Sequence, residues 1–254
     1  MNQQNEMEHS VIAGRNAVLE ALNAGVELDK IFIADHRFTG SLNKIVAIAK
    51  QRGVVVKQVS EQKLKAMCGT ENHQGVVATA SCARYAAVEE ILARAAERGE
   101  PPFLILADGV EDPHNLGALI RTAEASGAHG LIIPKRRSAS LTSIVQKTSA
   151  GAVSDLPAAR VPNLPSVMEE LKQQGLWFYA ADMDGTTWCE QDFSGPCGLV
   201  VGSEGEGVSR LVLEKCDFRI SLPMRGRVTS LNASVAGGIL MYEIARQRMG
   251  LRAK

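Results

Sequence analysis

Residues 108–127, DGVEDPHNLGALIRTAEASG, follow an apolar run typical of a buried strand and lead into a helix-like pattern. Two later segments repeat this arrangement of polar residues at the end of a strand: LVVGSEGEGVSR at 199–210 and ISLPMRGRVTSLNASVAGGILMYE at 220–243. In an open α/β sheet, ligands bind at the carboxyl ends of the strands. The three polar turns therefore predict one composite site.

The chain around these segments alternates apolar strands with helical patterns. Strands are expected at 103–107, 130–134, 177–181, 198–201 and 218–222, and helices at 116–126, 141–150, 164–174, 208–216 and about 230–248. Continuously apolar strands separated by helices predict an α/β fold with a parallel sheet covered on both faces.

A smaller α/β unit is expected before this sheet. Helical patterns at 14–24, 41–52 and 61–68 alternate with strand patterns at 30–34, 54–59 and 75–80. A charged amphipathic helix follows at 84–100 and is stopped by Pro101 and Pro102. We therefore expect an N-terminal domain over 9–83, a linker over 84–101 and a second domain over 102–254.

Composition excludes several classes of protein. Of the 254 residues, 45% are hydrophobic, which provides a sizeable core, and only 4% are aromatic, which argues against a single-strand binder built on stacked aromatic platforms. A net charge of zero argues against a generic nucleic-acid coat. Local basic patches remain candidates for RNA contact, with surface solvation as the alternative: Lys135 with Arg136 and Arg137, Arg225 with Arg227, and Arg246, Arg248, Arg252 and Lys254 in the tail.

The five cysteines form no C-x-x-C pair, and their odd number argues against a disulfide framework or a zinc site. The N-terminus lacks the basic and apolar regions of a secretory signal. No apolar run approaches the ~18 residues that would span a bilayer. We expect a cytoplasmic protein with no membrane anchor and no metal.

The glycines of the second segment have G-x-x-G-x-G spacing, at Gly202, Gly205 and Gly207. This is not the dinucleotide fingerprint G-x-G-x-x-G, and no GK[ST] phosphate loop is present. Glycines at a turn allow a ligand to approach the backbone closely, or they simply make a tight connection. Ser203 and Glu204 would then offer polar groups to the ligand.

Two residues of the first segment are candidates for chemistry. Asn115 lies where a helix N-cap would be, which is its structural alternative. Arg121 lies among apolar residues of the same helix, and a buried guanidinium needs an anionic partner. That partner would be Glu124 or Glu204 in a structural ion pair, or a phosphate or developing oxyanion in a functional site.

In the third segment, Ser230 and Asn232 precede a helix of small residues. Ser230 has the position of a simple helix cap, and the small residues allow close packing against backbone or ligand. Taken alone, this segment indicates little about function.

Together, the three segments resemble motifs one, two and three of the SpoU (TrmH-type) RNA ribose 2′-O-methyltransferases. The matching residues are Asn115-Leu116-Gly117 with Arg121, Gly202-Ser203-Glu204-Gly205, and Leu222-Pro223-Met224 with Ser230-Leu231-Asn232. Gly14-Arg15-Asn16-Ala17-Val18 and His73-Gln74-Gly75-Val76 resemble the ribosomal-protein-like substrate-binding domain attached to many members. The chain is most similar to the type that methylates a guanosine of 23S rRNA.

This resemblance implies a deep trefoil knot in the catalytic domain, S-adenosylmethionine as methyl donor, and a homodimer whose active site is completed across the interface. The resemblance places Gly202, Leu222 and Leu231 against the cofactor, with Met224, Ser203, Gly205, Ser230 and Asn232 lining its site.

The resemblance also implies catalytic roles for Arg121, Asn115, Glu204, Ser230 and Asn232. A free guanidinium has a pKa above ~12 and is a poor base, so we expect Arg121 to stabilise the forming alkoxide or to hold a phosphate that takes the proton. Asn115 would orient the ribose or Arg121, and Glu204 would hold Arg121 or a group of motif three. Ser230 and Asn232 would complete the pocket.

Three alternatives remain open at this point. The substrate could be tRNA or another rRNA nucleotide instead of a 23S rRNA guanosine. The chain could be an RNA-binding ribosome assembly factor without catalysis, although the intact motif residues argue against this. A nucleotide-dependent oxidoreductase lacks the expected glycine spacing.

Overall fold

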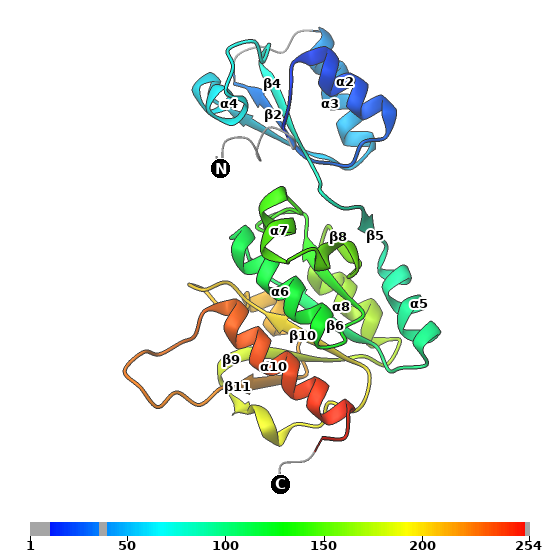
Figure 1. The fold of residues 1–254 in the computed structure, drawn as a ribbon, viewed down its shortest axis with the longest axis vertical. Coiled ribbons are helices and arrows are strands. Elements are labelled where there is room, and N and C mark those ends of the chain that lie inside the picture. Colours follow the sequence, from blue (N-terminus) through cyan, green and yellow to red (C-terminus); the bar gives the residue numbers. More distant parts are fainter. Residues whose placement is uncertain (1–10, 36–39, 252–254) are drawn as a thin grey trace. The chain divides into compact units, whose positions relative to one another are not determined.

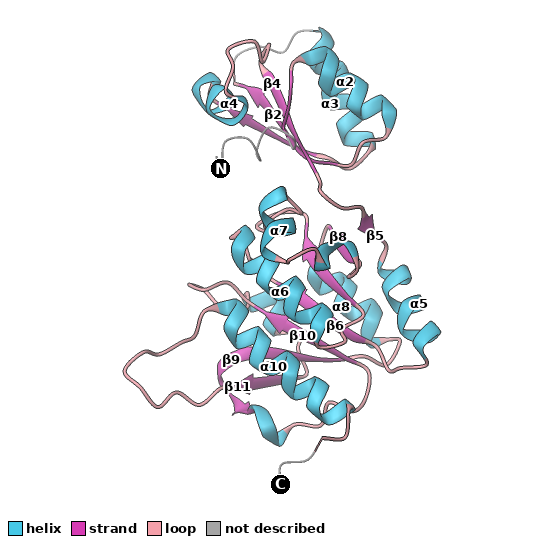
Figure 2. Cartoon of the chain, in the orientation of Figure 1, coloured by secondary structure: helices cyan, strands magenta, loops and turns pink. Residues whose placement is uncertain are grey.

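The computed structural model of the chain describes residues 11–35 and 40–251. These residues form two compact units, coloured along the sequence in Figure 1 and by secondary structure in Figure 2. Among the described residues, the first unit comprises those up to Arg84 together with Ser140–Ser143, and the second comprises Tyr85–Ala139 and those from Ile144 onward. Each unit has its own sheet.

The first unit is a small α/β structure. Its strands are β1 (Val11–Ala13), β2 (Leu28–Ala34), β3 (Val55–Val59) and β4 (Val76–Ala80), and its helices are α2 (Arg15–Ala24), α3 (Gly40–Gln51) and α4 (Glu61–Cys68). The sheet order is β1-β4-β2-β3, with β4 antiparallel to both neighbours and β2 parallel to β3. The apolar stripe of α2, with Val18 and Leu22 fully buried, packs with α3 residues such as Leu42 and Ile45 in the core.

The second unit contains the longer alternation. Its strands are β5 (Tyr85–Ala86), β6 (Phe103–Ala107), β7 (Gly130–Pro134), β8 (Ala158–Val161), β9 (Trp177–Thr187), β10 (Cys197–Val201) and β11 (Phe218–Ser221). Its α-helices are α5 (Val88–Arg98), α6 (Pro113–Ala125), α7 (Ser143–Thr148), α8 (Leu164–Lys172), α9 (Arg210–Leu213) and α10 (Ala233–Arg248), with short 3-10 helices η1 (Ala152–Ser154) and η2 (Trp188–Glu190).

The sheet of the second unit has the order β11-β9-β10-β6-β7-β8-β5, and every pair of neighbours is parallel. All residues of β6 and β10 are buried, as expected for central strands covered on both faces. Side chains of α5, α8 and α9 share a core with one face, while α6 and α10 pack together over β10 on the other (Figure 2). The predicted α/β fold with a parallel sheet is confirmed.

Three strands were not expected from the sequence, namely β1, β5 and β8. The expected linker over 84–101 contains β5 and α5, which belong to the second unit. The final helix begins at Ala233 and not near residue 230. None of the helices among the described residues combines the length and the hydropathy needed to cross a membrane.

The basic tail is partly structural. Arg246 pairs with the buried Glu243, and Arg248 donates hydrogen bonds to the carbonyl groups of Pro101, Pro102 and Gly195. These two side chains therefore fix the end of α10, which is the structural alternative to the RNA contact considered from the sequence. Arg252 and Lys254 lie outside the described residues.

Candidate active site

The three polar segments do follow strands of the parallel sheet. The first segment follows β6, and the second follows β10, which is the neighbour of β6 in the sheet. The third follows β11, which is separated from β10 by β9. All three turns therefore lie at the carboxyl edge of the sheet, where ligands of such folds bind. The predicted meeting of these segments is confirmed by direct contacts among their side chains.

The glycine-rich turn after β10 folds back on itself. The backbone groups of Ser203 and Gly207 exchange two hydrogen bonds of 3.0 Å, and the Ser203 hydroxyl accepts from the amide of Glu206. Gly202 is buried beneath this loop, and a Cβ placed there would lie 2.0 Å from the carbonyl carbon of Gly207. Gly207 itself has a φ of +66°, a conformation that favours glycine. The glycines thus serve loop closure.

Side chains from the three segments form one polar network. Asn115 Nδ2 donates to Glu204 Oε1 at 3.1 Å, and Asn232 Nδ2 donates to Asn115 Oδ1 at 2.9 Å and also to Glu204. Glu204 therefore holds a group of motif three, as one of the two predicted alternatives stated. The network ties the loop after β10 to α6 and to the start of α10.

The cap residues differ from those considered in the sequence. The N-cap of α6 is Asp112, whose side chain accepts from the His114 amide, and Asn115 lies inside the helix with 7% of its surface exposed. The N-cap of α10 is Asn232, whose Oδ1 accepts from two backbone amides, so Ser230 is an exposed loop residue and not the cap. Asn232 thus combines capping with membership of the network.

Arg121 is neither buried nor paired. Its side chain is exposed on α6 and makes no hydrogen bond or ion pair with any residue that the structure describes. The expected structural partners, Glu124 and Glu204, do not bind it. Six residues of helix also place Arg121 about 120° around the axis from Asn115, so it faces away from the network.

A cavity of about 440 Å³ lies beside the glycine-rich loop. Eight of the predicted site residues contribute to its lining: Gly202, Ser203, Glu204, Gly205, Leu222, Met224, Ser230 and Leu231. Ile220 and Leu240 add apolar walls. A concave site with apolar walls and a few convergent polar groups is typical of a small-molecule pocket.

A second cavity of about 540 Å³ shares four lining residues with the first, namely Ser203, Glu204, Glu206 and Ala233. It is also lined by Asn115 and by Arg137, a non-glycine residue with a φ of +53°. Strained backbone of this kind often marks functional sites. The polar network therefore contributes side chains to two adjoining cavities, and Arg121 lines neither of them.

Two residues at this site were missed from the sequence. Ser234 donates its hydroxyl to Asn232 Oδ1 at 2.6 Å, and its position two residues after a capping asparagine is a signal that could have been read. Asp108 Oδ2 accepts from the Ser209 amide at 2.7 Å and ties the end of β6 to the start of α9. The sequence gives no signal for this tie, because Asp108 and Ser209 are far apart in the chain.

The cysteines take no part in the site. All five are free thiols, and no cluster of three or more potential metal-ligating side chains occurs among the described residues. Burial raises the pKa of Cys197 to about 11 and that of Cys216 to about 12, so neither provides a thiolate near neutral pH.

Two family models match the chain. The SpoU rRNA Methylase family matches residues 102–242, and the model for RNA 2′-O ribose methyltransferase substrate binding matches residues 11–86. The first match contains the first two polar segments and the third as far as Tyr242, and the second contains the sheet and helices of the first unit.

Known proteins agree with these matches. YacO of Bacillus subtilis (strain 168), assigned to the TrmH family of tRNA/rRNA methyltransferases, is 46% identical over 95% of this chain and 97% of its own length. An AdoMet-bound rRNA methyltransferase of Sinorhizobium meliloti has a TM-score of 0.59 at 25% identity, covering 99% of this chain and 92% of the other. The SpoU methyltransferase AviRb of Streptomyces viridochromogenes, in complex with AdoMet, shares the fold at a TM-score of 0.61 and 24% identity, covering 98% and 95%. A family match over more than half of the chain, with a near full-length relative, shows that this protein belongs to the SpoU rRNA methylase family.

Proposed function

We propose that this protein methylates a ribose 2′-hydroxyl of RNA, with S-adenosylmethionine as donor and a guanosine of 23S rRNA as acceptor. The observation that carries the proposal is the Asn115–Glu204–Asn232 network, in which Glu204 lines both of two adjoining cavities. A transfer reaction needs two ligand sites that share a wall, because donor and acceptor must meet in a defined geometry.

The first cavity fits the cofactor. Leu222, Leu231 and Leu240 provide apolar surface for an adenine ring, and the polar edge at Ser203 and Ser230 suits the ribose and amino-acid portions. A cavity of about 440 Å³ lies within the ~300–1,000 Å³ range of small-ligand sites. The missing side chain at Gly202 lets the loop close over this space.

The cofactor, when bound, supplies an electrophilic methyl group attached to a positively charged sulfur. Glu204 and the two asparagines hold the loops that form the wall, so the acceptor oxygen meets a preorganised site. The second cavity receives the acceptor nucleotide, and Arg137 lies where a phosphate of that nucleotide would be held.

Arg121 assists the deprotonation of the 2′-hydroxyl. The 2′-hydroxyl must lose its proton as the new O–C bond forms, and a guanidinium stabilises the resulting negative charge or fixes a phosphate that accepts the proton. Because Arg121 is exposed and faces away from its own network, we assign it to the active site of a partner subunit.

A homodimer provides that partner. α10 carries an exposed apolar stripe of Val235, Ile239 and Tyr242, which are 49%, 38% and 54% exposed. The neighbouring Gly238 lies against Thr122, the residue after Arg121. The stripe and the arginine thus belong to one pair of packed helices, suited to a two-fold interface. The trefoil knot and a cytoplasmic location also belong to this proposal.

The test is mass spectrometry of ribose-methylated nucleosides in rRNA and tRNA from cells with and without the gene. We expect the loss of one 2′-O-methylguanosine from 23S rRNA, restored by the wild-type chain and not by Arg121→Ala. Loss from tRNA would support RNA ribose methylation with tRNA as the substrate, an alternative that the family name of YacO includes beside rRNA. No change in either fraction would favour a non-catalytic RNA-binding assembly factor.

A further inference from the structure

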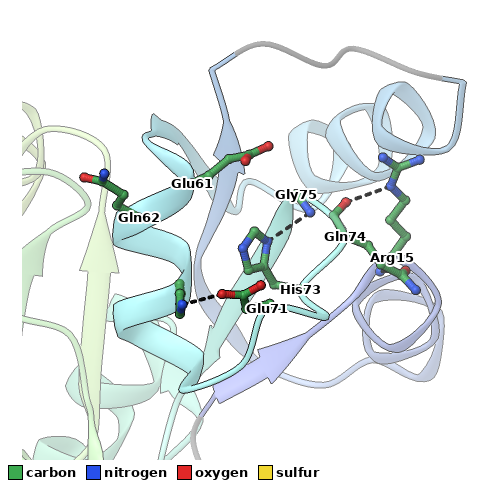
Figure 3. Close-up of a pocket in the computed structure, with 8 residues that line it drawn as sticks. Arg15, Glu61, Gln62, Glu71, His73, Gln74 and Gly75 are labelled. Atoms are coloured by element: carbon green, nitrogen blue, oxygen red, sulfur yellow. Dashed lines mark hydrogen bonds and ion pairs between the residues drawn. The ribbon is translucent and has the colours of Figure 1, made fainter.

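We propose that the first unit contains a binding pocket for an unpaired guanine base of the RNA, an inference that rests on the proposed function only in taking RNA as the ligand. The pocket is a cavity of about 650 Å³ between α4, the start of α2 and the start of β4 (Figure 3). All of its lining residues belong to the first unit: Arg15, Glu61, Gln62, Lys65, Glu71, His73, Gln74 and Gly75.

The histidine of this pocket is the strongest indication of a ligand. His73 is 7% exposed, and its Nδ1 accepts a hydrogen bond of 3.1 Å from the Gly75 amide (Figure 3). Because Nδ1 is the acceptor, the donor of the ring is Nε2–H. Nε2 remains accessible at the cavity wall, and no residue among 11–35 and 40–251 accepts a hydrogen bond from it, so this donor of a largely buried ring is open to a ligand.

The wall around His73 is held in a strained conformation. Gln74 is a non-glycine residue with a φ of +51°. Arg15 donates two hydrogen bonds to it: the backbone amide to Gln74 Oε1 at 3.0 Å, and Nε to the Gln74 carbonyl oxygen at 2.9 Å. Strain that the surroundings maintain is typical of binding sites. Arg15 thereby holds in place the turn that carries His73 at the cavity wall.

The charges of the pocket favour a base over a phosphate. Arg15 and Lys65 are balanced by Glu61 and Glu71, and Lys65 pairs directly with Glu71. A phosphate site needs an excess of cations, which this lining does not provide. A neutral base with polar edges, in contrast, is bound by donors and acceptors together.

Among the bases, guanine matches the available groups best. Its Watson–Crick edge presents two adjacent donors, N1–H and N2–H, beside the acceptor O6. The carboxylate of Glu61 makes no hydrogen bond or ion pair with any described residue, so it is available to accept both donors at once. The Nε2–H of His73 provides the donor for O6 or N7.

The experiment measures how the full-length protein binds four fluorescent RNA stem–loops that differ only in the central loop nucleotide: guanosine, inosine, adenosine or uridine. We expect guanosine to bind about tenfold more tightly than uridine or adenosine, with inosine intermediate because it lacks the N2 amino group. Equal binding of all four RNAs would overturn the proposal and indicate that phosphates alone are contacted.

Two variants locate the preference. His73→Asn keeps an acceptor for the Gly75 amide and removes the Nε2 donor, and Glu61→Gln replaces the carboxylate on an exposed position of α4. Both should bind the four RNAs alike, whereas Glu20→Gln, a matched change on the exposed face of α2, should keep the guanosine preference. Survival of the preference in Glu61→Gln would overturn the pocket assignment even if His73→Asn failed to fold.

Methyl transfer to total RNA from labelled S-adenosylmethionine is measured in parallel. A guanosine preference without transfer would support this inference and contradict the proposed function. Methyl transfer without a guanosine preference would support the proposed function and contradict the guanine pocket. The two proposals can therefore fail independently.

Discussion

Gly202 lies at the carboxyl end of β10, where its missing side chain lets the loop close. A Cβ at this position would lie 2.0–2.3 Å from backbone atoms of Gly207 and Val208, which a rotamer change cannot relieve. We predict that Gly202→Ala weakens S-adenosylmethionine binding by at least about tenfold and lowers the melting temperature. Calorimetric titration and thermal unfolding measure the two effects.

Gly205 provides the matched control for that prediction. It lies in the same loop, but a Cβ there meets nothing within 4 Å, and its φ is not in the left-handed region. Gly205→Ala should therefore bind the cofactor almost as the wild type does. Equal losses in both variants would show that the loop needs backbone freedom at every glycine and not space at Gly202.

Asn232 has two functions that one substitution can separate. Its Oδ1 caps α10, while its Nδ2 donates to Asn115 and Glu204. Asn232→Asp keeps a capping oxygen but places a second carboxylate against Glu204. We predict a fall in kcat/KM of about tenfold or more with little change in melting temperature, because the cap is retained.

Asn232→Ala is the comparison for this variant, since it removes the cap as well as the donor. It should lower both activity and stability, the latter by about 1 kcal/mol. Wild-type kcat/KM in Asn232→Asp would show that the network does not position reacting groups.

At the scale of single residues, the sequence grouped residues that do line one cavity, but it did not specify their hydrogen-bond partners. Ser203, Leu222 and Ser230 contribute to one wall because short motifs at strand ends place them there. The cap at Asn232 and the exposure of Arg121 depend on where helices begin and how they rotate, which spacing does not specify.

At the scale of elements, the sequence failed to predict strands whose apolar periodicity is weak. β8 is four residues long and contains Arg160, and β5 has only two residues, so neither gives a strand pattern. β9 continues to Thr187 through a polar stretch because β11 pairs with it across a register shift. Pairing with a distant strand is not encoded in local sequence.

The junction of α5, β6 and β7 contains a pH-sensitive contact. His129 is fully buried; its Nδ1 accepts from the Phe103 amide, and its Nε2 lies 3.0 Å from Glu100 Oε2. Burial lowers the pKa of His129 below 6.5, although the hydrogen bond to Glu100 acts in the opposite direction. Protonation would also remove the acceptor that the Phe103 amide needs.

We predict that the free energy of unfolding decreases as the pH falls below about 6.5, because the unfolded chain then binds a proton that the folded chain resists. The decrease from this group is at most about 1.4 kcal/mol per pH unit. Urea unfolding between pH 5 and 8 measures it. His129→Asn, which keeps an acceptor for Phe103, should show a flatter profile, and Glu100→Gln a steeper one. Parallel profiles in all three proteins would remove His129 as the cause.

At the scale of the whole molecule, the proposed arrangement divides each active site between two subunits. Asn115, Glu204 and Asn232 hold the cofactor side within one protomer, while Arg121 is exposed and unpaired among the residues described. The apolar stripe on α10 supplies the contact that would bring a second Arg121 into place. No pattern in a single chain reports this division, since it is a property of the pair.

Two defective subunits should therefore restore activity when they are combined. In a heterodimer of Arg121→Ala with Asn232→Asp, one site receives the intact arginine and the intact asparagine, and the other site receives both defects. We predict about half of the wild-type methyl transfer from the heterodimer, purified through two different affinity tags, although each homodimer is nearly inactive. If Arg121 served its own protomer, every site in the heterodimer would carry one defect and its activity would stay at the level of the homodimers. A wild-type chain paired with Arg121→Ala should give half activity in either case, which verifies that mixed dimers form and remain folded.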